Sequence, residues 1–192
     1  MKRMFCTIAL FCLLGTALPA QYIGGGLSLA GIASQIDGDQ WGGYKKIGYH
    51  IGGWATYDFN DWLAMQIEIL HSHRGSREVV KDFGQVSLNF IDVPVLLRIR
   101  PLQNLPREAW VEVGPSVHYL LSAKTGFNNL KVDQSDNYRR VSGELGLGMG
   151  TFLTDHIAFF GRWNIGVTNL SRFVRPWFTI HYFSFGFKFG MQ

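Results

Sequence analysis

The sequence predicts an all-β fold, an eight-stranded antiparallel up-and-down transmembrane β-barrel. Three observations lead to this fold class. Apolar and polar residues alternate with a period of two along most of the chain, which is typical of strands whose two faces differ. Short and long connections alternate between these strands, and the N-terminal segment has the layout of a secretory signal peptide.

Residues 1–20 are predicted to be a signal peptide. Lys2 and Arg3 precede an apolar run from Met4 to Leu14, and small residues follow up to Ala20. The apolar run is too short to cross a membrane as a helix. We therefore expect cleavage after Ala20.

Residues 21–192 are expected to form a single barrel domain. Both cysteines, Cys6 and Cys12, leave with the signal peptide, so the mature chain has no disulfide and no thiol. A lipoprotein signal at Cys12 is the alternative, but the bulky Phe11 stands where such signals carry a small residue. The mature chain keeps 16 of the 18 basic residues and all 14 acidic ones, and this net charge of 16 − 14 = +2 is too small to predict nucleic-acid binding.

The eight predicted strands follow one another along the whole mature chain. They cover residues 21–33, 46–59, 62–74, 86–100, 108–122, 139–153, 157–169 and 177–190. The first strand carries Gly24 and Gly26 on its polar face, and the second is marked by the aromatic residues Tyr49, Tyr57 and Phe59.

The third, fourth and fifth strands each place apolar side chains opposite charged ones. In the third, four aliphatic side chains oppose Glu68. In the fourth, the stretch FIDVPVLLRIR places five aliphatic side chains opposite Asp92 and Arg98. In the fifth, valines oppose Glu112 and His118. A charged face on so many strands is unusual for a soluble core.

The last three strands repeat this pattern. In the sixth, Leu147 and its apolar neighbours oppose Glu144 and three glycines. In the seventh, Arg162 lies on the face opposite Trp163, and in the eighth Lys188 stands between two phenylalanines. The period of two is therefore kept to the end of the chain.

The connections differ in length in a regular way. Strands two and three are joined by Asn60-Asp61, strands six and seven by Thr154-Asp155-His156, and strands four and five by the proline-bounded PLQNLPR. Most other connections are longer and polar, among them AKTGFNNLKVDQSDNYR. Short turns at one end and long loops at the other are typical of outer-membrane barrels.

The alternative to a membrane barrel is a lipocalin-like soluble barrel, which is apolar inside and polar outside. The glycines decide between the two, because several of them, including Gly114, Gly146 and Gly148, share the polar face. A barrel of eight strands has a narrow interior, so small residues belong inside. The polar face is therefore predicted to line the lumen and the apolar face to contact lipid, with aromatic girdles at both ends.

Several blocks of the sequence resemble a known family. They are SQIDGDQWGGYKKIGYHIGGWATY, MQIEILHSHRGS, NFIDVPVLLRIRP, VEVGPSVHYLLSAK and GRWNIGVTNL. In this order they are similar to the PorT-like outer membrane β-barrel family, over essentially the whole mature chain. The resemblance implies an eight-stranded outer-membrane barrel. It also implies a possible accessory role in type IX-like protein secretion, although most family members have no assigned role.

Seven charged side chains are predicted to form a structural network in the lumen. They are Glu68, Asp92, Arg98, Glu112, Glu144, Arg162 and Lys188. Counting from the short turns places Arg98, Glu112 and Lys188 in one tier and Glu68, Asp92 and Arg162 in the next, with Glu144 and His50 higher. Buried charges must be paired, so a closed plug is the expected role. A proton or ion path and a general acid–base pair are the alternatives.

The sequence His71-Ser72-His73 suggests two further kinds of site. The two histidines share a face and could bind a metal, but no further ligand is evident. A serine beside histidines is also found in small-barrel lipid hydrolases, yet Ser72 points away from both neighbours, which breaks the nucleophile–base geometry and leaves a lipid-modifying enzyme as a remote alternative. We therefore expect no enzyme activity, no metal and no cofactor.

Two classes of function remain open at this stage. The first is a structural or interaction protein whose loops or periplasmic rim bind envelope or secretion-complex proteins, with outer-membrane lipid as its surroundings. The second is a narrow pore or transport element. In both cases the N- and C-termini are expected in the periplasm.

Overall fold

The computed structural model describes residues 23–38, 43–78, 84–100, 109–127, 130–172 and 178–191, so the predicted signal peptide, residues 1–20, lies outside the described residues. The strands are β1 (Ile23–Asp37), β2 (Lys46–Asn60), β3 (Leu63–Arg77), β4 (Gln85–Ile99), β5 (Ala109–Phe127), β6 (Leu130–Asp133), β7 (Val141–Thr154), β8 (Ile157–Gly166) and β9 (Thr179–Met191). A short 3-10 helix, η3, covers Ser135–Asn137. No helix among the described residues is long and apolar enough to span a bilayer.

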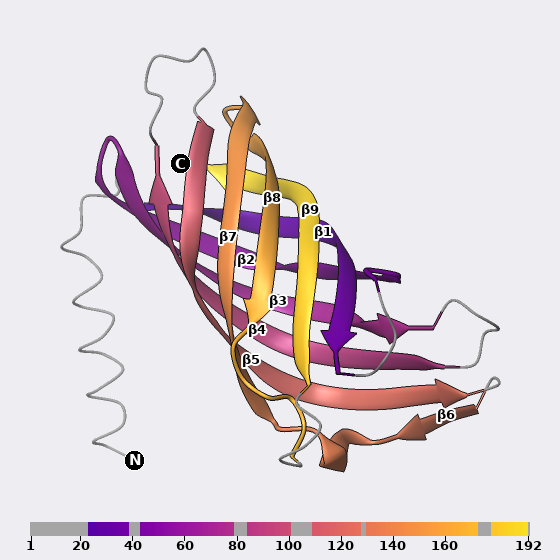
Figure 1. Ribbon diagram of the computed structural model, residues 1–192. Coiled ribbons are helices and arrows are strands. Elements are labelled where there is room, and N and C mark those ends of the chain that lie inside the picture. The colour runs from indigo at the N-terminus through magenta and orange to yellow at the C-terminus, as the bar shows by residue number, and fades with distance from the viewer. Residues whose placement is uncertain are drawn as a thin grey trace, which may run out of the picture.

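Eight of these strands form a closed antiparallel barrel (Figure 1). They follow the order β4-β3-β2-β1-β9-β8-β7-β5, and β4 pairs with β5 to complete the ring. The first and last strands pair from Gly25 opposite Met191 to Asp37 opposite Thr179. Each of these strands therefore has a partner on both sides, which satisfies the backbone hydrogen bonds within the ring. The predicted fold class is confirmed.

The two ends of the barrel differ, and we call them the turn end and the loop end. At the turn end, Asn60 Oδ1 accepts hydrogen bonds from the backbone N–H groups of Trp62 and Leu63, at 3.1 and 2.9 Å, and so closes the turn from β2 to β3. The turn from β7 to β8 lies at the same end, as do the start of β1 and the end of β9 (Figure 1). The connections from β1 to β2, β3 to β4 and β8 to β9, and the β5–β6 hairpin, lie at the loop end.

The outer surface of the barrel is apolar around its whole circumference. Large apolar side chains that are more than half exposed come from most of its strands, among them Leu27, Ile47, Ile69, Val117, Val141, Leu147, Met149 and Phe185. Exposed aromatic side chains lie near both ends of the barrel. Phe59 and Trp62 near the turn end, and Tyr49 and Tyr119 near the loop end, are each about half exposed. A soluble monomer rarely exposes an apolar surface of this extent, whereas lipid requires one.

The glycines of the inner face make room for large side chains. A Cβ added at Gly150 would lie 2.3 Å from Cζ2 of Trp110, so this glycine is the space into which the indole packs. A Cβ at Gly148 would lie 3.1 Å from Glu112 Oε1 and 3.2 Å from Arg162 Cβ. The lumen beside β7 is therefore already filled by side chains from other strands.

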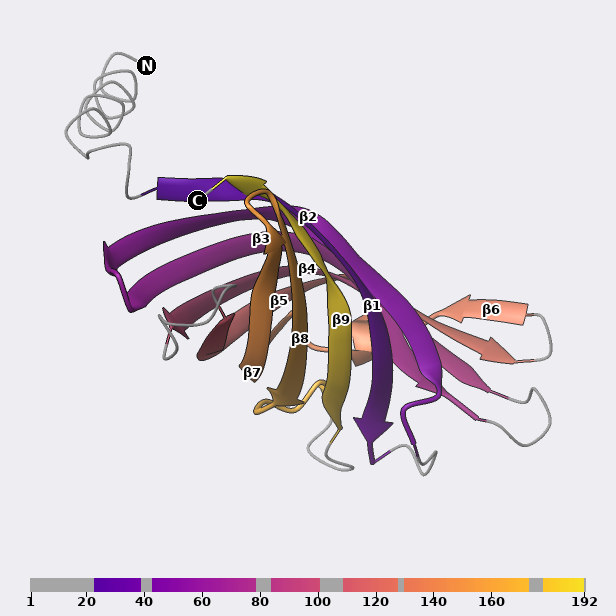
Figure 2. The same cartoon turned by 90° about the horizontal axis from the view of Figure 1, so that it is seen from above.

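The described residues form nine strands, one more than the eight of the predicted ring, because part of the connection after β5 is itself a strand. β5 continues to Phe127, and β6 pairs back onto it as a hairpin that projects beyond the barrel at the loop end (Figure 2). A strand outside the bilayer needs no apolar face. The sequence of β6 therefore lacks the alternation of apolar and polar residues by which the other strands are predicted. For the same reason β1 extends to Asp37, beyond the predicted end at residue 33.

Leu147 tests the assignment of the outer face. It is 57% exposed on β7, whereas Leu153 lies near the turn end of the same strand. Leu147→Arg should cost about 2–4 kcal/mol in the free energy of unfolding measured after refolding into lipid bilayers, and Leu153→Arg about 0–1 kcal/mol, because the cost of arginine falls toward the interface. Gly148→Arg should prevent folding by crowding the lumen. Equal stabilities for the Leu147 variant and the unchanged protein would show that this face does not contact lipid.

Candidate functional site in the barrel interior

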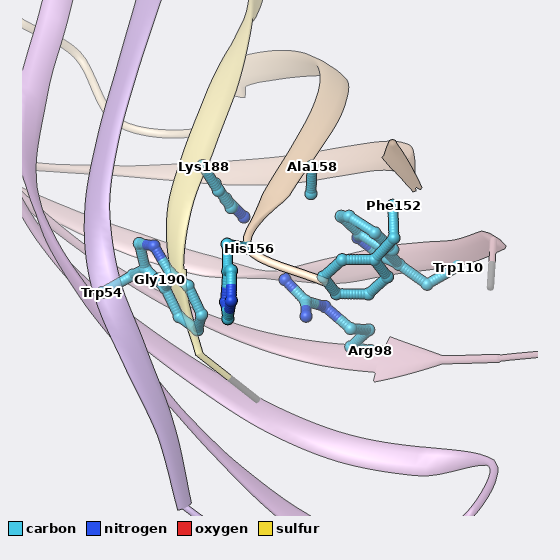
Figure 3. A pocket seen from close by; sticks show the side chains of 8 residues that line it. All are labelled: Trp54, Arg98, Trp110, Phe152, His156, Ala158, Lys188 and Gly190. Atoms are coloured by element: carbon cyan, nitrogen blue, oxygen red, sulfur yellow. The ribbon is translucent and has the colours of Figure 1, made fainter. Parts of the chain in front are cut away.

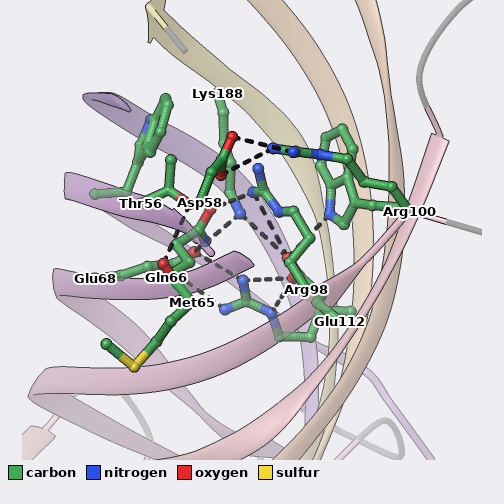
Figure 4. A network of polar contacts seen from close by, with 12 residues as sticks. Thr56, Asp58, Met65, Gln66, Glu68, Arg98, Arg100, Glu112 and Lys188 are labelled. Atoms are coloured by element: carbon green, nitrogen blue, oxygen red, sulfur yellow. Dashed lines mark hydrogen bonds and ion pairs between the residues drawn. The ribbon is translucent and has the colours of Figure 1, made fainter. Parts of the chain in front are cut away.

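Inward-pointing polar side chains near the turn end form a group that we call the turn-end cluster. It consists of Gln66 and Glu68 from β3, Arg98 from β4, Glu112 from β5, Arg162 from β8 and Lys188 from β9. All of these except Arg162 are labelled in Figure 4. Every one of these side chains is buried. The period-two alternation brings them inside, since each follows an outward apolar residue along its strand.

Arg162 connects the two carboxylates of the turn-end cluster. Its Nη1 and Nη2 atoms bind both oxygens of Glu68, at 3.0 and 2.8 Å, and its Nε donates to Glu112 Oε1 at 2.8 Å. The guanidinium group thus bridges the lumen from β8 to β3 and β5. The planar fork of arginine suits this bidentate contact, which a lysine could not make.

Two further cations complete the turn-end cluster. Lys188 Nζ lies 2.9 Å from Glu68 Oε1 and 3.5 Å from Glu112 Oε2. Arg98 donates to Gln66, stacks on the Trp110 ring at 4.2 Å, and has its Nη2 atom 4.0 Å from Glu112 Oε2. Arg98 is therefore the cation held least closely by a carboxylate.

A separate pair lies at the rim of the turn end. Arg100 Nη1 and Nη2 donate to the two carboxylate oxygens of Asp58, at 3.0 and 3.1 Å (Figure 4). This bidentate contact connects β2 to the residue that follows β4. It neutralises both groups outside the turn-end cluster.

A second group, the loop-end cluster, consists of Arg74, Asp92, His118 and Glu144. Arg74 Nη1 lies 2.6 Å from Asp92 Oδ2, and Nη2 lies 3.0 Å from Glu144 Oε1. His118 contacts the same two carboxylates, with Nδ1 2.6 Å from Asp92 Oδ1 and Nε2 3.0 Å from Glu144 Oε2, and its Nδ1 also lies 3.0 Å from Arg74 Nη2. The imidazole therefore occupies the position of a second cation in a closed ring of four side chains.

Aromatic rings surround Arg74. The rings of Phe90 and Tyr182 have their centroids 4.4 and 4.5 Å from its guanidinium carbon. Ser72 Oγ accepts a hydrogen bond from Arg74 Nη1 at 2.9 Å. Arg74 is fully buried, so these contacts and the two carboxylates supply the surroundings that water would otherwise provide.

Apolar side chains fill the lumen on both sides of the charges. Toward the loop end, Ile36, Val86, Leu88, Phe90, Leu120, Ala123, Leu170 and Ile180 form one buried cluster. Toward the turn end, Trp110 and Phe160 pack with Ala30 and Ala158. The His50 ring stacks on Phe160 at 5.9 Å and lies opposite Ser72 in the β2–β3 register, so it occupies the space between the two charged clusters. Apolar side chains therefore lie along the lumen on both sides of the charged clusters.

The structure places all seven predicted network residues inside the barrel, but it groups them differently. Arg98 and Glu112 lie opposite each other in register, as predicted. The predicted tier that joined Asp92 to Glu68 and Arg162 is wrong, because Asp92 instead contacts Arg74 and His118. Counting residues from a turn ignores the tilt of the strands, which displaces each strand along the axis relative to its neighbours.

Arg74 and His118 are the two members of the loop-end cluster that the predicted network does not include. Arg74 is the last residue of the predicted third strand, 62–74. The alternation along the strand already indicates an inward position for Arg74, because Arg74 shares a face with Gln66, Glu68 and Ser72. The strand extends to Arg77, so this position still lies inside the ring.

His71, Ser72 and His73 take the orientations that alternation predicts. Ser72 is fully buried, and its hydroxyl accepts a hydrogen bond from Arg74, a group that cannot act as a base. The two histidines lie on the outer face beside Tyr49, with His73 directly opposite it in the β2–β3 register and each imidazole ring 6.0 Å from the tyrosine ring. Within the part of the chain that the structure describes, no group of three or more His, Cys, Asp or Glu side chains could hold a metal ion.

Glu112→Gln tests the turn-end cluster. The substitution keeps the shape of the side chain but removes the charge that faces Arg162, Lys188 and Arg98. We expect a loss of about 3–5 kcal/mol in the free energy of unfolding, as for a buried ion pair that loses one partner. Asp136→Asn is the matched control, since Asp136 is exposed and lies 4.0 Å from Arg140, and it should cost less than about 1 kcal/mol. Equal urea midpoints for the two variants would contradict this pairing scheme.

Solved structures with a similar fold include two bacterial proteins. Among solved structures, Ail, the attachment invasion locus protein of Yersinia pestis, matches with a TM-score of 0.55 and 14% identity over 88% of this chain and 98% of its own. Ail has also been solved in complex with the heparin analogue sucrose octasulfate. Neisserial surface protein A matches with a TM-score of 0.52 and 11% identity over 87% of this chain and 96% of its own. At these identities the likeness concerns the fold alone.

The comparison of sequences gives the family. No curated protein matches the chain at a significant level. The family model described as outer membrane protein beta-barrel domain matches residues 6–189. This family is broader than the PorT-like one that the sequence blocks resemble, and the narrower resemblance stays a prediction. Since the match covers nearly the whole chain, the protein belongs to the outer membrane protein β-barrel domain family and is a protein of the outer membrane.

Proposed function

We propose that the protein is a closed structural barrel of the outer membrane that acts by presenting its rims to other envelope components. The observation that carries this proposal is the packing of the lumen, in which two paired charge clusters lie between apolar side chains. Eight strands enclose a lumen just wide enough for side chains. The side chains buried in the lumen stabilise the ring. The surfaces left for binding other molecules are then the rims at the two ends of the barrel.

The loop end is the better candidate for such an interaction surface. There the β5–β6 hairpin extends beyond the barrel (Figure 2), and Val132 on β6 is 55% exposed. Outer-membrane lipid surrounds the apolar outer surface of the barrel between its two ends. An accessory role in type IX-like secretion rests on the resemblance of the sequence blocks to the PorT-like family, and envelope or secretion-complex proteins would then be the partners.

The same proposal includes the orientation of the chain. Short turns of outer-membrane barrels face the periplasm, which supports a periplasmic position for the turn end and for both termini. The predicted removal of residues 1–20 fits export to that side. We infer no catalytic role, since the hydroxyl of Ser72 and the carboxylates of the lumen are engaged by arginines.

A narrow pore is the competing function, and conductance separates the two. The purified barrel in a planar bilayer should give no stable single-channel current, because its interior is packed with paired groups. Protein-free bilayers supply the baseline. Steady currents whose ion selectivity changes on Glu112→Gln would instead show that the turn-end cluster lines a conducting path.

Orientation can be tested with single cysteines, because the mature chain is expected to contain none. Asp136→Cys at the loop end should react with a membrane-impermeant maleimide in intact cells. Asp155→Cys at the turn end should react only after the outer membrane is permeabilised. Both aspartates are exposed, so access to the reagent is the only intended difference. The reverse labelling pattern would place the turn end outside, and recovery of the protein in the soluble periplasmic fraction would contradict the membrane location itself.

A further inference from the structure

A small pocket opens at the turn end, beside the turn-end cluster (Figure 3). Its walls come from Trp54, Arg98, Trp110, Phe152, His156 and Lys188, together with Ala158 and Gly190. The side-chain ends of Arg98 and Lys188 point toward the middle of the pocket, with Trp110 and Phe152 on one side and Trp54 on the other (Figure 3). The space holds about one molecule of the size of water.

The charges around this pocket do not balance. The turn-end cluster contains the cations Arg98, Arg162 and Lys188 and the carboxylates Glu68 and Glu112, which leaves 3 − 2 = +1. The nearby Arg100 does not change this count, because it pairs with Asp58. A buried charge without a partner is costly, and the cost falls when an opposite charge is bound.

Arg98 is the source of the excess charge. It is 1% exposed, and its Nε atom has no hydrogen-bond partner among the described residues. Its only hydrogen bond to them goes from Nη2 to Gln66, and its nearest carboxylate oxygen is 4.0 Å away. Donors of one buried guanidinium are therefore unused on the wall of a pocket that has room for a guest.

We propose that the turn-end pocket binds one small monovalent anion, of about the size of chloride, against the guanidinium group of Arg98. The anion would neutralise the excess charge and accept hydrogen bonds from Arg98, with Lys188 adding attraction from the opposite strand. The aromatic walls exclude larger hydrated ions and give the anion a surrounding of low polarity, which strengthens its attraction to the two cations. The closed barrel of the proposed function does not depend on a bound anion. This proposal can therefore fail while the proposed function holds.

The test measures unfolding by urea in zwitterionic vesicles, with sodium chloride compared with sodium gluconate at equal ionic strength. A ligand that binds only the folded state raises the midpoint in proportion to its occupancy. The midpoint should therefore rise with chloride and level off as the site fills, because gluconate is too large to enter. Absence of a rise, or a rise that continues without levelling off, would overturn the proposal.

Variants identify where the anion binds. Arg98→Met removes the excess cation, so its urea midpoint should be the same in chloride as in gluconate, whatever the stability of the variant itself. Arg140→Met, at a half-exposed arginine of the loop end, is the matched control and should keep the rise. A chloride effect that survives in the Arg98 variant would exclude this site.

Bromide gives a direct reading that does not depend on any variant folding. Crystals of the unchanged protein grown with bromide should contain one anomalous peak in the turn-end pocket, within hydrogen-bond distance of Arg98. A pocket without such a peak, at bromide concentrations that reproduce the chloride effect, would contradict the proposal.

Discussion

The pairing of β1 with β9 is the constraint on which the rest of the structure depends. Lipid offers no hydrogen bonds, so the backbone of a sheet in the membrane must satisfy its own groups, and only a closed ring leaves no unpaired edge. Once eight strands close, the interior is narrow and shut off from lipid, and the outside must be apolar. The usual arrangement of a soluble protein is thereby reversed, with Leu147 outside and Glu144 inside.

Closure also explains why each charge cluster is built around an arginine. Arg162 reaches from β8 to carboxylates on β3 and β5, and Arg74 reaches from β3 to carboxylates on β4 and β7. Most of these contacts join strands that are not neighbours in the sheet, so they fix the width of the lumen as well as neutralising charge. A fork with five donors can satisfy two carboxylates at once, which suits a space with little room for water.

The two clusters solve the same electrostatic problem in different ways. In the loop-end cluster, each of the two carboxylates, Asp92 and Glu144, contacts both the guanidinium group of Arg74 and the imidazole ring of His118. In the turn-end cluster three cations meet two carboxylates, and the excess lies beside the small pocket. The charges of the loop-end cluster are therefore shared among its own four side chains, whereas the turn-end cluster has one more cation than it has carboxylates, and that excess lies on the wall of the small pocket. This difference gives the two ends of one lumen distinct chemistry.

The sequence by itself determined the fold class, the number of strands in the ring and the face on which each charge lies. A period of two is a local property, because successive side chains of a strand always point to opposite faces. The sequence also predicted that Arg98 faces Glu112, since both lie at similar distances from the turn that joins their strands. Only the tertiary structure decided that Asp92 pairs with Arg74 rather than with Arg162, and that β6 extends the loop end. Those features depend on the tilt of the strands and on contacts across the lumen, and no pattern within a single strand encodes either of them.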